Sequence, residues 1–423
     1  MVAVPKHVVV LVDPLRAGTK LPQLFNGLGH QCVCVLSAES PTTWWRDSLR
    51  SQDFVAVLNE EDGVEAVVDA LERYEPLCIV PGGESGVLLA DRLSDRFPHL
   101  PGNDPSTSTA RRDKFEMAAR LRHNGLAAID GVRTGNVATA TQFYLGLSEP
   151  YAVVKPLAST AADGVRFVDS EPALREVVAA LVGSTDLFGR TNDEVLVQED
   201  ISRDGVEFTV NSVSSRGRHF ITEVWRMHRD MMDATAVCVY SELISTADQR
   251  YRVLTDYCAS VLDAVGTVNG AAHSEIMLRP AGPVLIETSS RIEGACNPAT
   301  VQALLGHSQN SLLPLSYLDP NGFNRAIEYR MDKPRHARHV YLLSTRKGQV
   351  LRAPTWDRVL SLPTLVSLDS TLDTTTTLTR TTSLATCPGN LYLASDDEDA
   401  VIRDYEHFRQ LEAELYEQML TPA

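Results

Sequence analysis

The chain lacks any long apolar run. None of its 423 residues lies in a stretch approaching the roughly 20 apolar residues that a spanning helix needs. Residues 1–6 lead straight into an apolar strand pattern rather than into a signal peptide. Basic residues are also in deficit: the net charge is −16, which argues against a nucleic-acid footprint or a membrane-surface patch. The composition predicts a cytoplasmic, globular protein that binds neither nucleic acid nor a membrane.

Cysteine and lysine are both scarce. The seven cysteines are scattered, with no CxxC or zinc spacing, so we expect reduced core residues and no structural metal knuckle. There are six lysines against 33 arginines, and a lysine that is present therefore has a stronger claim to a role. The Walker pattern GxxxxGK[ST] is absent as well. Any basic side chain that binds phosphate must therefore be identified individually.

The first hundred residues alternate short apolar runs with helical segments. The runs at 7–13, 31–36, 53–58 and 77–81 predict the strands of a parallel α/β sheet. After the fourth run comes Gly82-Gly83-Glu84-Ser85, which either binds an anion or a substrate carboxylate through backbone N–H groups or simply enters a helix. The stretch 98–109, rich in Pro, Gly, Asn, Ser and Thr, indicates a domain boundary.

Two carboxylates stand on a predicted hairpin. The runs 273–278 and 284–291 are joined by Arg279-Pro280-Ala281-Gly282-Pro283, so Glu275 and Glu287 face each other on one side. Oxygen ligands without His or Cys favour Mg²⁺, which keeps positions for water and phosphates. Arg291, four residues after Glu287, adds a permanent cation to that face. An ordinary hairpin with solvated acids is the alternative.

Two lysines precede this hairpin. Lys114 lies near the start of a helix predicted over 108–124 and ended by Gly125, where an exposed helix lysine is the alternative. Lys155 closes the β-branched strand 151–156 and is followed by Pro, so a solvated position does not suit it. The small-residue loop 157–165 can then lie close over a phosphate chain.

A further strand, 194–201, runs out into Gln198, Glu199 and Asp200. Its backbone edge can hydrogen-bond a purine, and Glu207 beyond the next turn can accept the hydroxyls of a ribose. An amphipathic hairpin with exposed acids explains the same residues.

Taken in order, these segments resemble the ATP-grasp superfamily over roughly residues 1–320. The family pattern has an N-terminal α/β domain, two lysines, a flap, a Q-E strand, an H-x-E and an E-x-N-x-R, and this chain departs from it at Ser289 and at Glu293-Gly294. Within the superfamily, residues 220–230 and the C-terminal tail resemble the L-amino-acid ligase and carnosine-synthase-like group.

The resemblance implies a mixed α/β and α+β architecture. It predicts a Rossmann-like parallel α/β domain over 1–105, an ATP-grasp domain over 106–332 with a lid at about 135–200, and a β-rich domain over 333–423 with a terminal helix. The Thr-rich run 370–383 alternates with Leu and predicts an exposed strand pair.

The resemblance also implies ATP and Mg²⁺ as cofactors, with two ions expected and Mn²⁺ as a substitute. Catalytic roles fall to Arg291 and to His228, for which a surface histidine is the alternative. The predicted ATP contacts are Lys114, Lys155, Ser159, Thr160, Gly164, Gln198, Glu199, Ile201 and Glu207. The predicted metal ligands are Glu275, Glu287 and Ser289. The predicted substrate contacts are Glu84, Ser85, His273, Ser290, Glu293 and Gly294.

The implied activity is that of a carboxylate–amine ligase. An amino acid or similar small acid would be activated as an acyl phosphate and joined to an amine, releasing ADP and phosphate, as in the synthesis of a dipeptide or specialised metabolite. Glu293 suggests a substrate that carries positive charge. A bicarbonate-using carboxylase and an inactive nucleotide-binding regulator are the alternatives. The sequence does not define the oligomeric state, although a homodimer is common among the relatives.

Overall fold

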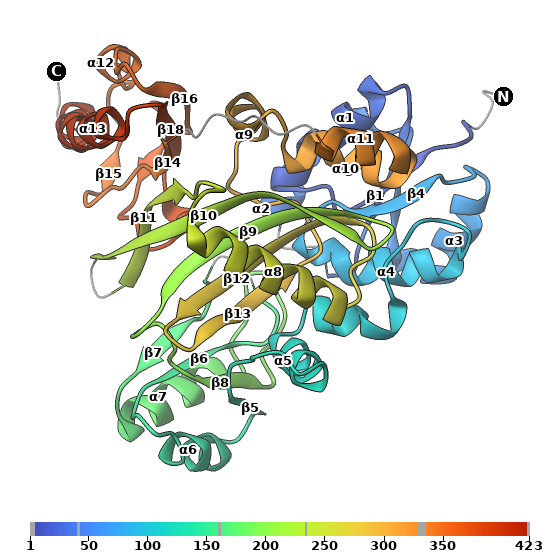
Figure 1. The fold of residues 1–423 in the computed structure, drawn as a ribbon, viewed down its shortest axis with the longest axis horizontal. Coiled ribbons are helices and arrows are strands. Elements are labelled where there is room, and N and C mark those ends of the chain that lie inside the picture. The colour runs from blue at the N-terminus through green and yellow to red at the C-terminus, as the bar shows by residue number, and fades with distance from the viewer. Residues whose placement is uncertain (1–4, 40–42, 160–161, 233–234, 329–335, 421–423) are drawn as a thin grey trace.

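The computed structural model describes residues 5–39, 43–159, 162–232, 235–328 and 336–420 (Figure 1). Within these ranges, no helix has both the length and the apolar character needed to cross a membrane.

The N-terminal segment forms the predicted parallel sheet. Its strands run in the order β3-β2-β1-β4: β1 (Val9–Val12), β2 (Cys32–Leu36), β3 (Ala56–Asn59) and β4 (Cys78–Pro81). The accompanying helices are α1 (Leu21–Gly27), α2 (Thr43–Arg46), α3 (Val64–Glu72) and α4 (Val87–Arg96). After β4 the chain enters α4 through a short 3-10 turn, Glu84–Gly86. A Cβ on Gly86 would lie 2.3 Å from the carbonyl oxygen of Val12, so the turn packs tightly against β1.

A second, antiparallel sheet has the strand order β5-β8-β6-β7 and lies at the bottom of Figure 1. Its members are β5 (Gly131–Thr134), β6 (Ala152–Pro156), β7 (Arg166–Val168) and β8 (Val195–Glu199), with α6 (Val137–Leu145) and α7 (Glu171–Leu181) packed against it. We refer to residues 131–199 as the lid. Both strands predicted in this region, 151–156 and 194–201, are present, the second ending at Glu199.

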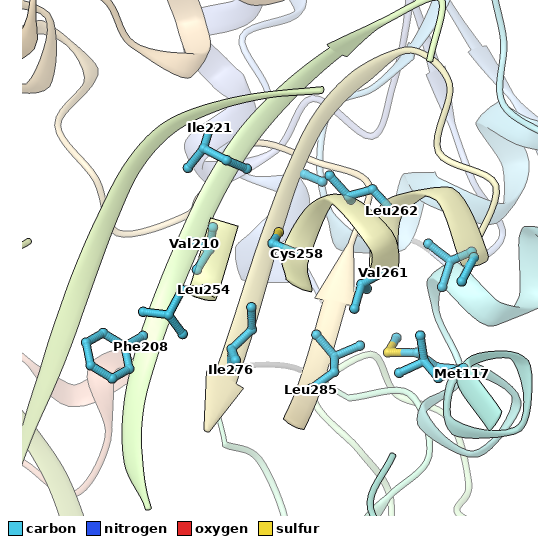
Figure 2. Close-up of a cluster of buried hydrophobic side chains, with 14 of the residues drawn as sticks. Met117, Phe208, Val210, Ile221, Leu254, Cys258, Val261, Leu262, Ile276 and Leu285 are labelled. Carbon is cyan, nitrogen blue, oxygen red and sulfur yellow. The ribbon is translucent and has the colours of Figure 1, made fainter. Parts of the chain in front are cut away.

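The largest sheet is central, in the order β13-β12-β9-β10-β11-β14-β18-β16. The five strands that precede residue 330 are β9 (Val206–Ser215), β10 (Arg218–Met232), β11 (Thr235–Leu243), β12 (Gly270–Arg279) and β13 (Gly282–Ser289). The helices α5 (Lys114–His123) and α8 (Gln249–Ala264) cover one face, where Met117, Leu254 and Val261 meet Phe208, Ile276 and Leu285 (Figure 2). The opposite face is polar around Glu275 and Asn211, and it is apolar at Val213, Phe220 and Ala271, which pack with residues 312–317.

The helix predicted over 108–124 is shorter than expected. Residues Pro105–Arg111 form a 3-10 helix, and α5 begins only at Lys114, because the side chain of Asp113 accepts hydrogen bonds from the N–H groups of Phe115 and Glu116 at 2.8 and 3.1 Å. Lys114 is therefore the first residue of its helix, and Gly125 follows the helix end at φ +72°, as predicted.

The C-terminal segment continues the central sheet. The strands β14 (His336–Tyr341), β18 (Gly389–Ser395) and β16 (Leu365–Ser370) extend it beyond β11, and α13 (Glu398–Leu420) packs on this part. The remaining elements are α9 (Pro298–Leu305), α10 (Gln309–Leu318), α11 (Pro320–Glu328), β15 (Gly348–Gln349), α12 (Asp357–Leu360) and β17 (Thr377–Leu378). The three-domain division at 105 and 332 stays a prediction.

The strand pair predicted over the Thr-rich run 370–383 is wrong. Beyond Ser370, which ends β16, only Thr377–Leu378 forms a strand in this run, and its partner is Gly348–Gln349, outside the run. Asp373 instead accepts hydrogen bonds from the hydroxyls of Thr375 and Thr376, which holds a turn where alternation with Leu predicted a strand.

One arginine joins the N-terminal and central sheets. Arg111 is fully buried and pairs with Asp91 of α4 at 2.7 Å. Its Nη1 donates to the carbonyl oxygens of Val265 and Gly266 just after α8, at 2.7 and 3.2 Å. The two parts of the molecule therefore share a buried, hydrogen-bonded charge.

Candidate active site

The hairpin predicted from the sequence has the predicted register. In β12 and β13, Glu275 lies opposite Glu287, and the strands are joined by a two-residue loop between Arg279 and Gly282. Both carboxylates lie on the polar face of the central sheet, since Ile276 and Leu285 fill the core on the other side.

The two predicted lysines meet this acid pair. The Lys114 ammonium lies 2.6 Å from a carboxylate oxygen of Glu287 and donates to the carbonyl oxygen of Ser159 at 3.2 Å. Lys155, at the end of β6, is only 6 % exposed. Burial, and then the charge of Lys114, bring the pKa of Lys155 down to about 8, although Glu287 and Glu275 act in the opposite sense. Two ammonium groups thus share a small region with two carboxylates.

The donor set fits a hard divalent cation. Burial alone would raise the pKa of Glu275, but His273, whose Nε2 lies 3.7 Å from the carboxylate, and the charges of Arg229 and Lys114 lower it, so this group is ionised. The hydroxyl of Ser289, on the strand beside His273, is buried without a hydrogen-bond partner in the described part of the chain. Two carboxylates and a free hydroxyl are oxygen ligands of the kind that Mg²⁺ prefers.

A three-residue charge cluster lies at the edge of the parallel sheet. Nε of Arg291 donates to Glu84 at 2.7 Å, and Nη1 of Arg112 lies 3.3 Å from the other oxygen of the same carboxylate. Burial opposes ionisation, yet the charges of Arg291, Arg112 and Lys114 hold the pKa of Glu84 at about 2. The Gly82–Ser85 turn thus enters a helix and also carries an acid into the site.

The sequence did not single out Arg112. Its guanidinium is 3 % exposed, and none of its three nitrogens has a hydrogen-bond partner within the described ranges. Lys114 stands out in the sequence because lysine is rare, whereas one arginine among 33 carries no comparable signal.

The loop over the lysines is held by its own side chains. Ser159 donates to Asp163 at 2.7 Å, and Asp163 also accepts from the N–H of Leu187 at 3.0 Å. Gly164 has φ +68°, and a Cβ there would lie 2.9 Å from the Pro156 ring, which explains the glycine. Thr160 lies outside the described residues.

The predicted purine edge borders an apolar cavity. Gln198 is buried in the middle of the lid sheet and, with Lys114, lines a cavity of about 10 Å³ completed by apolar residues of α5, β13 and the 126–130 segment. Ile201 is buried with Ile129 and Met277, next to Val284 and Ile286. Glu199 is half-buried, and its N–H donates to the carbonyl of Asp130 at 3.1 Å.

Glu207 has a partner that the sequence did not reveal. Arg229 donates from Nε and Nη2 to the two carboxylate oxygens of Glu207 at 2.7 and 2.6 Å. Burial lowers the pKa of Arg229, but Glu207 outweighs it and raises that pKa. A ribose bound at Glu207 would meet a carboxylate whose position is already fixed by a bidentate arginine.

A chain of hydrogen-bonded side chains leads from His273, beside Glu275, to the neighbouring strands of the central sheet. Nδ1 of His273 lies 2.8 Å from the amide oxygen of Asn211, and the amide nitrogen of Asn211 donates to Glu223 at 2.7 Å and to Glu293. Asn211 and Glu223 were not predicted. Of the remaining predicted substrate contacts, Ser85 and Ser290 are buried and Gly294 is exposed.

His228 is not brought together with these residues. Its ring stacks on Tyr240 with centroids 4.2 Å apart, and its Nε2 lies 3.3 Å from Glu242. Glu223 and His228 are five residues apart on β10, so their side chains point to opposite faces of the sheet. A catalytic role for His228 stays a prediction without geometric support.

Comparison with known proteins gives one consistent result. A family model described as an ATP-grasp domain matches residues 148–299. Dapdiamide A synthase from Enterobacter agglomerans is 29 % identical over 417 residues, covering 97 % of each chain.

Solved structures agree at the level of the fold. An L-amino acid ligase from Bacillus licheniformis has a TM-score of 0.74 at 15 % identity, covering 96 % of this chain and 98 % of that one. The biotin carboxylase domain of the 2-oxoglutarate carboxylase from Hydrogenobacter thermophilus, solved with ADP, its magnesium salt and bicarbonate, has a TM-score of 0.61 at 13 % identity, covering 92 % and 86 %.

Proposed function

We propose that this chain is an ADP-forming ligase that joins an amino acid, or a similar small acid, to an amine, because residues 148–299 match an ATP-grasp domain and the chain resembles dapdiamide A synthase and L-amino acid ligase. The amide product would be a dipeptide or a related specialised metabolite.

One observation carries the proposal: paired carboxylates and paired ammonium groups converge on a single face. Glu275 lies opposite Glu287, Lys114 contacts Glu287 at 2.6 Å, and Lys155 is buried beside them. A carboxylate pair repels itself unless cations intervene, and the lysines are free to move to phosphates once metal neutralises the acids. This arrangement suits a metal-bound polyphosphate.

Magnesium would be held by Glu275 and Glu287, with Ser289 as a further oxygen ligand, and we propose two ions. ATP-grasp enzymes use ATP with Mg²⁺. Bound there, Mg²⁺ would neutralise charge on the phosphates and on the group being transferred.

The chain's own residues then have distinct tasks. Lys114 and Lys155 bind the phosphates, with the loop that contains Ser159 and Gly164 closing over them. The lid edge at Gln198, Glu199 and Ile201 holds the adenine, and Glu207 holds the ribose.

The chemistry follows from the poor leaving ability of a carboxylate oxygen. That oxygen attacks the γ-phosphorus, the bond to the β-γ bridging oxygen breaks, and ADP leaves with the electron pair. The amine nitrogen then attacks the acyl carbon, loses a proton, and phosphate departs. Arg291 stabilises the negative charge that develops at both stages. Closure of the lid excludes water, which would otherwise hydrolyse the acyl phosphate.

The experiment is a screen of ADP and phosphate release over pairs of amino acids and amines, with mass spectrometry of the product. We expect ADP release only with particular pairs, and its loss in the double variant Glu275→Ala/Glu287→Ala. The matched control is Glu176→Ala, an exposed residue of α7.

Failure to release ADP with any acid or amine would support an inactive nucleotide-binding protein instead. Bicarbonate-dependent release without an amide product would support a carboxylase. A homodimer and a cytoplasmic location are carried forward as predictions.

A further inference from the structure

A second acid pair lies on the same polar face of the central sheet. A cavity of about 10 Å³ is bordered by Glu223 of β10, by Glu293 and by Cys296. The start of α9 and the first residues of α10 complete its wall: Pro298, Val301, Ser308, Gln309 and Asn310. The volume suffices for one water-sized group.

The cavity brings two acids together, and burial and the charge of Glu293 raise the pKa of Glu223 to about 7. Asn211 donates its amide nitrogen to one oxygen of Glu223, at 2.7 Å, and to one of Glu293. Glu223 is only 3 % exposed, and among the described residues its second carboxylate oxygen has no hydrogen-bond partner. No ion pair joins either acid to a basic side chain within the described ranges. The amino end of α10, which borders the cavity, supplies only about half an elementary charge.

These groups are suited to a hydrogen-bond donor that carries positive charge. The carboxylate oxygens are acceptors, and the amide nitrogens of Asn211 and Gln309 already donate to other groups, so an occupant that donates fits this cavity. A carboxylate buried without a partner is costly, and a cation removes that cost. Burial, followed by the charges of Glu293 and Glu223, raises the pKa of the Cys296 thiol well above its usual range, so this thiol is neutral and adds no charge to the cavity.

The cavity adjoins the proposed reaction centre. Asn211 binds His273, which reaches Glu275, and Glu293 follows the catalytic Arg291 by two residues. We propose that Glu223 and Glu293 bind the primary ammonium group of the amino acid whose carboxylate is activated. An ammonium between two carboxylates is held protonated and cannot act as a nucleophile, so it belongs to the donor and not to the attacking amine. This inference rests on the proposed function.

The test compares each standard amino acid with its des-amino counterpart, such as L-alanine with propionate, as the acid substrate. In the wild type we expect kcat/KM for the accepted amino acid to exceed that of its counterpart at least tenfold. Glu223→Gln and Glu293→Gln should each remove most of this preference by raising KM for the amino acid, while KM for ATP stays unchanged. Glu176→Gln is the control. Equal use of both acids by the wild type, or a preference that survives in both glutamine variants, would overturn the inference.

A binding measurement separates this inference from the proposed function. The same acids are titrated calorimetrically into the protein with MgADP present, where no turnover is needed. Amino acids that bind at least tenfold more weakly to the glutamine variants support the ammonium site, even if no ADP is released in the screen. If the variants bind these acids as the wild type does, the cavity holds water and the inference is wrong. If the wild type holds a bound Zn²⁺ that the variants lose, the cavity is a metal site and the inference is also wrong.

Discussion

At the scale of single residues, the site consists of charges that compensate one another in the absence of substrate. Lys114 is paired with Glu287, Arg291 with Glu84, and Arg229 with Glu207. Each pair joins a group with a proposed role in binding phosphate, substrate or ribose to a partner of opposite sign, which lowers the cost of burying it. When nucleotide and metal bind, the members of these pairs must change partners. Single substitutions at these positions therefore distinguish an effect on binding from an effect on folding.

Substitution of Lys155 is the most direct test of nucleotide binding. Lys155→Met should raise KM for ATP by about ten- to a hundredfold, because a charge-assisted hydrogen bond contributes roughly 1.5–3 kcal/mol. Steady-state kinetics at saturating acid and amine would measure this change. Lys347→Met, at an exposed position in the C-terminal segment, is the control. An unchanged KM in the Lys155 variant would remove this lysine from the nucleotide site.

Glu84 supplies a prediction with a defined pH window. The pKa of Glu84 is about 2 against an ordinary 4.5, so the folded state binds this proton less readily than the unfolded state does. The carboxylate therefore stabilises the fold above pH 4.5, by about 3 kcal/mol, and loses this contribution as the pH falls toward 2. Glu84→Gln should lower the free energy of unfolding in urea at pH 7, by an amount that shrinks at pH 3.

The control for this measurement is Glu65→Gln. Glu65 pairs with Arg96 on the surface, with 72 % of its side chain exposed, and should change the free energy of unfolding very little at either pH. A Glu84 variant whose effect is the same at pH 7 and pH 3 would contradict the pKa assignment.

At the scale of elements, the residue at which a helix begins and the pairing between strands determine where the functional side chains lie. The pairing of Glu275 with Glu287 was predicted from a hairpin that folds back around residue 281. In the structure this pairing depends on a register irregularity between Glu275 and Ile276, which a period of two does not reveal. The contact of Asn211 with Glu223 could not be predicted, because β10 has an irregularity between Ile221 and Glu223 that changes which face the following residues occupy, up to a second irregularity between His228 and Arg229. The same shift explains why His228 could not be placed from sequence.

Asp113 tests whether a helix start positions a phosphate ligand. Asp113→Ala removes the cap of α5 and should cost about 1 kcal/mol of stability. KM for ATP should rise severalfold at the same time, because Lys114 is the next residue. Thermal unfolding and steady-state kinetics measure the two effects. Asp113→Asn, which keeps a capping oxygen, should restore most of both, and equal loss in the two variants would contradict the capping role.

At the scale of the whole molecule, the lid touches the N-terminal segment directly. Phe188 lies edge-on to Trp45 with ring centroids 5.9 Å apart, and the guanidinium groups of Arg112 and Arg190 lie over its ring at 4.9 and 5.1 Å. Arg190 also pairs with Glu39 at 3.2 Å. These contacts connect regions that are far apart in sequence, and no local pattern predicts them.

Phe188→Ala should weaken this closure and admit water to the acyl phosphate. We expect the ratio of ADP released to amide formed to rise by roughly twofold or more, because closed lids protect such intermediates. Comparing ADP release with product by mass spectrometry measures the ratio. Phe167→Ala, at a residue 57 % exposed on β7, is the control. A ratio that stays at the wild-type value would show that the Phe188 contact does not seal the site.

The unbroken central sheet limits how the chain can be shortened. Because β14 pairs with β11 and carries β18 and β16 beyond it, removal of the tail after residue 335 would strip β11 of its outer neighbour. Unpaired backbone N–H and C=O groups on an exposed edge strand pair with strands of other chains. The truncated protein should therefore precipitate and not remain a smaller working enzyme.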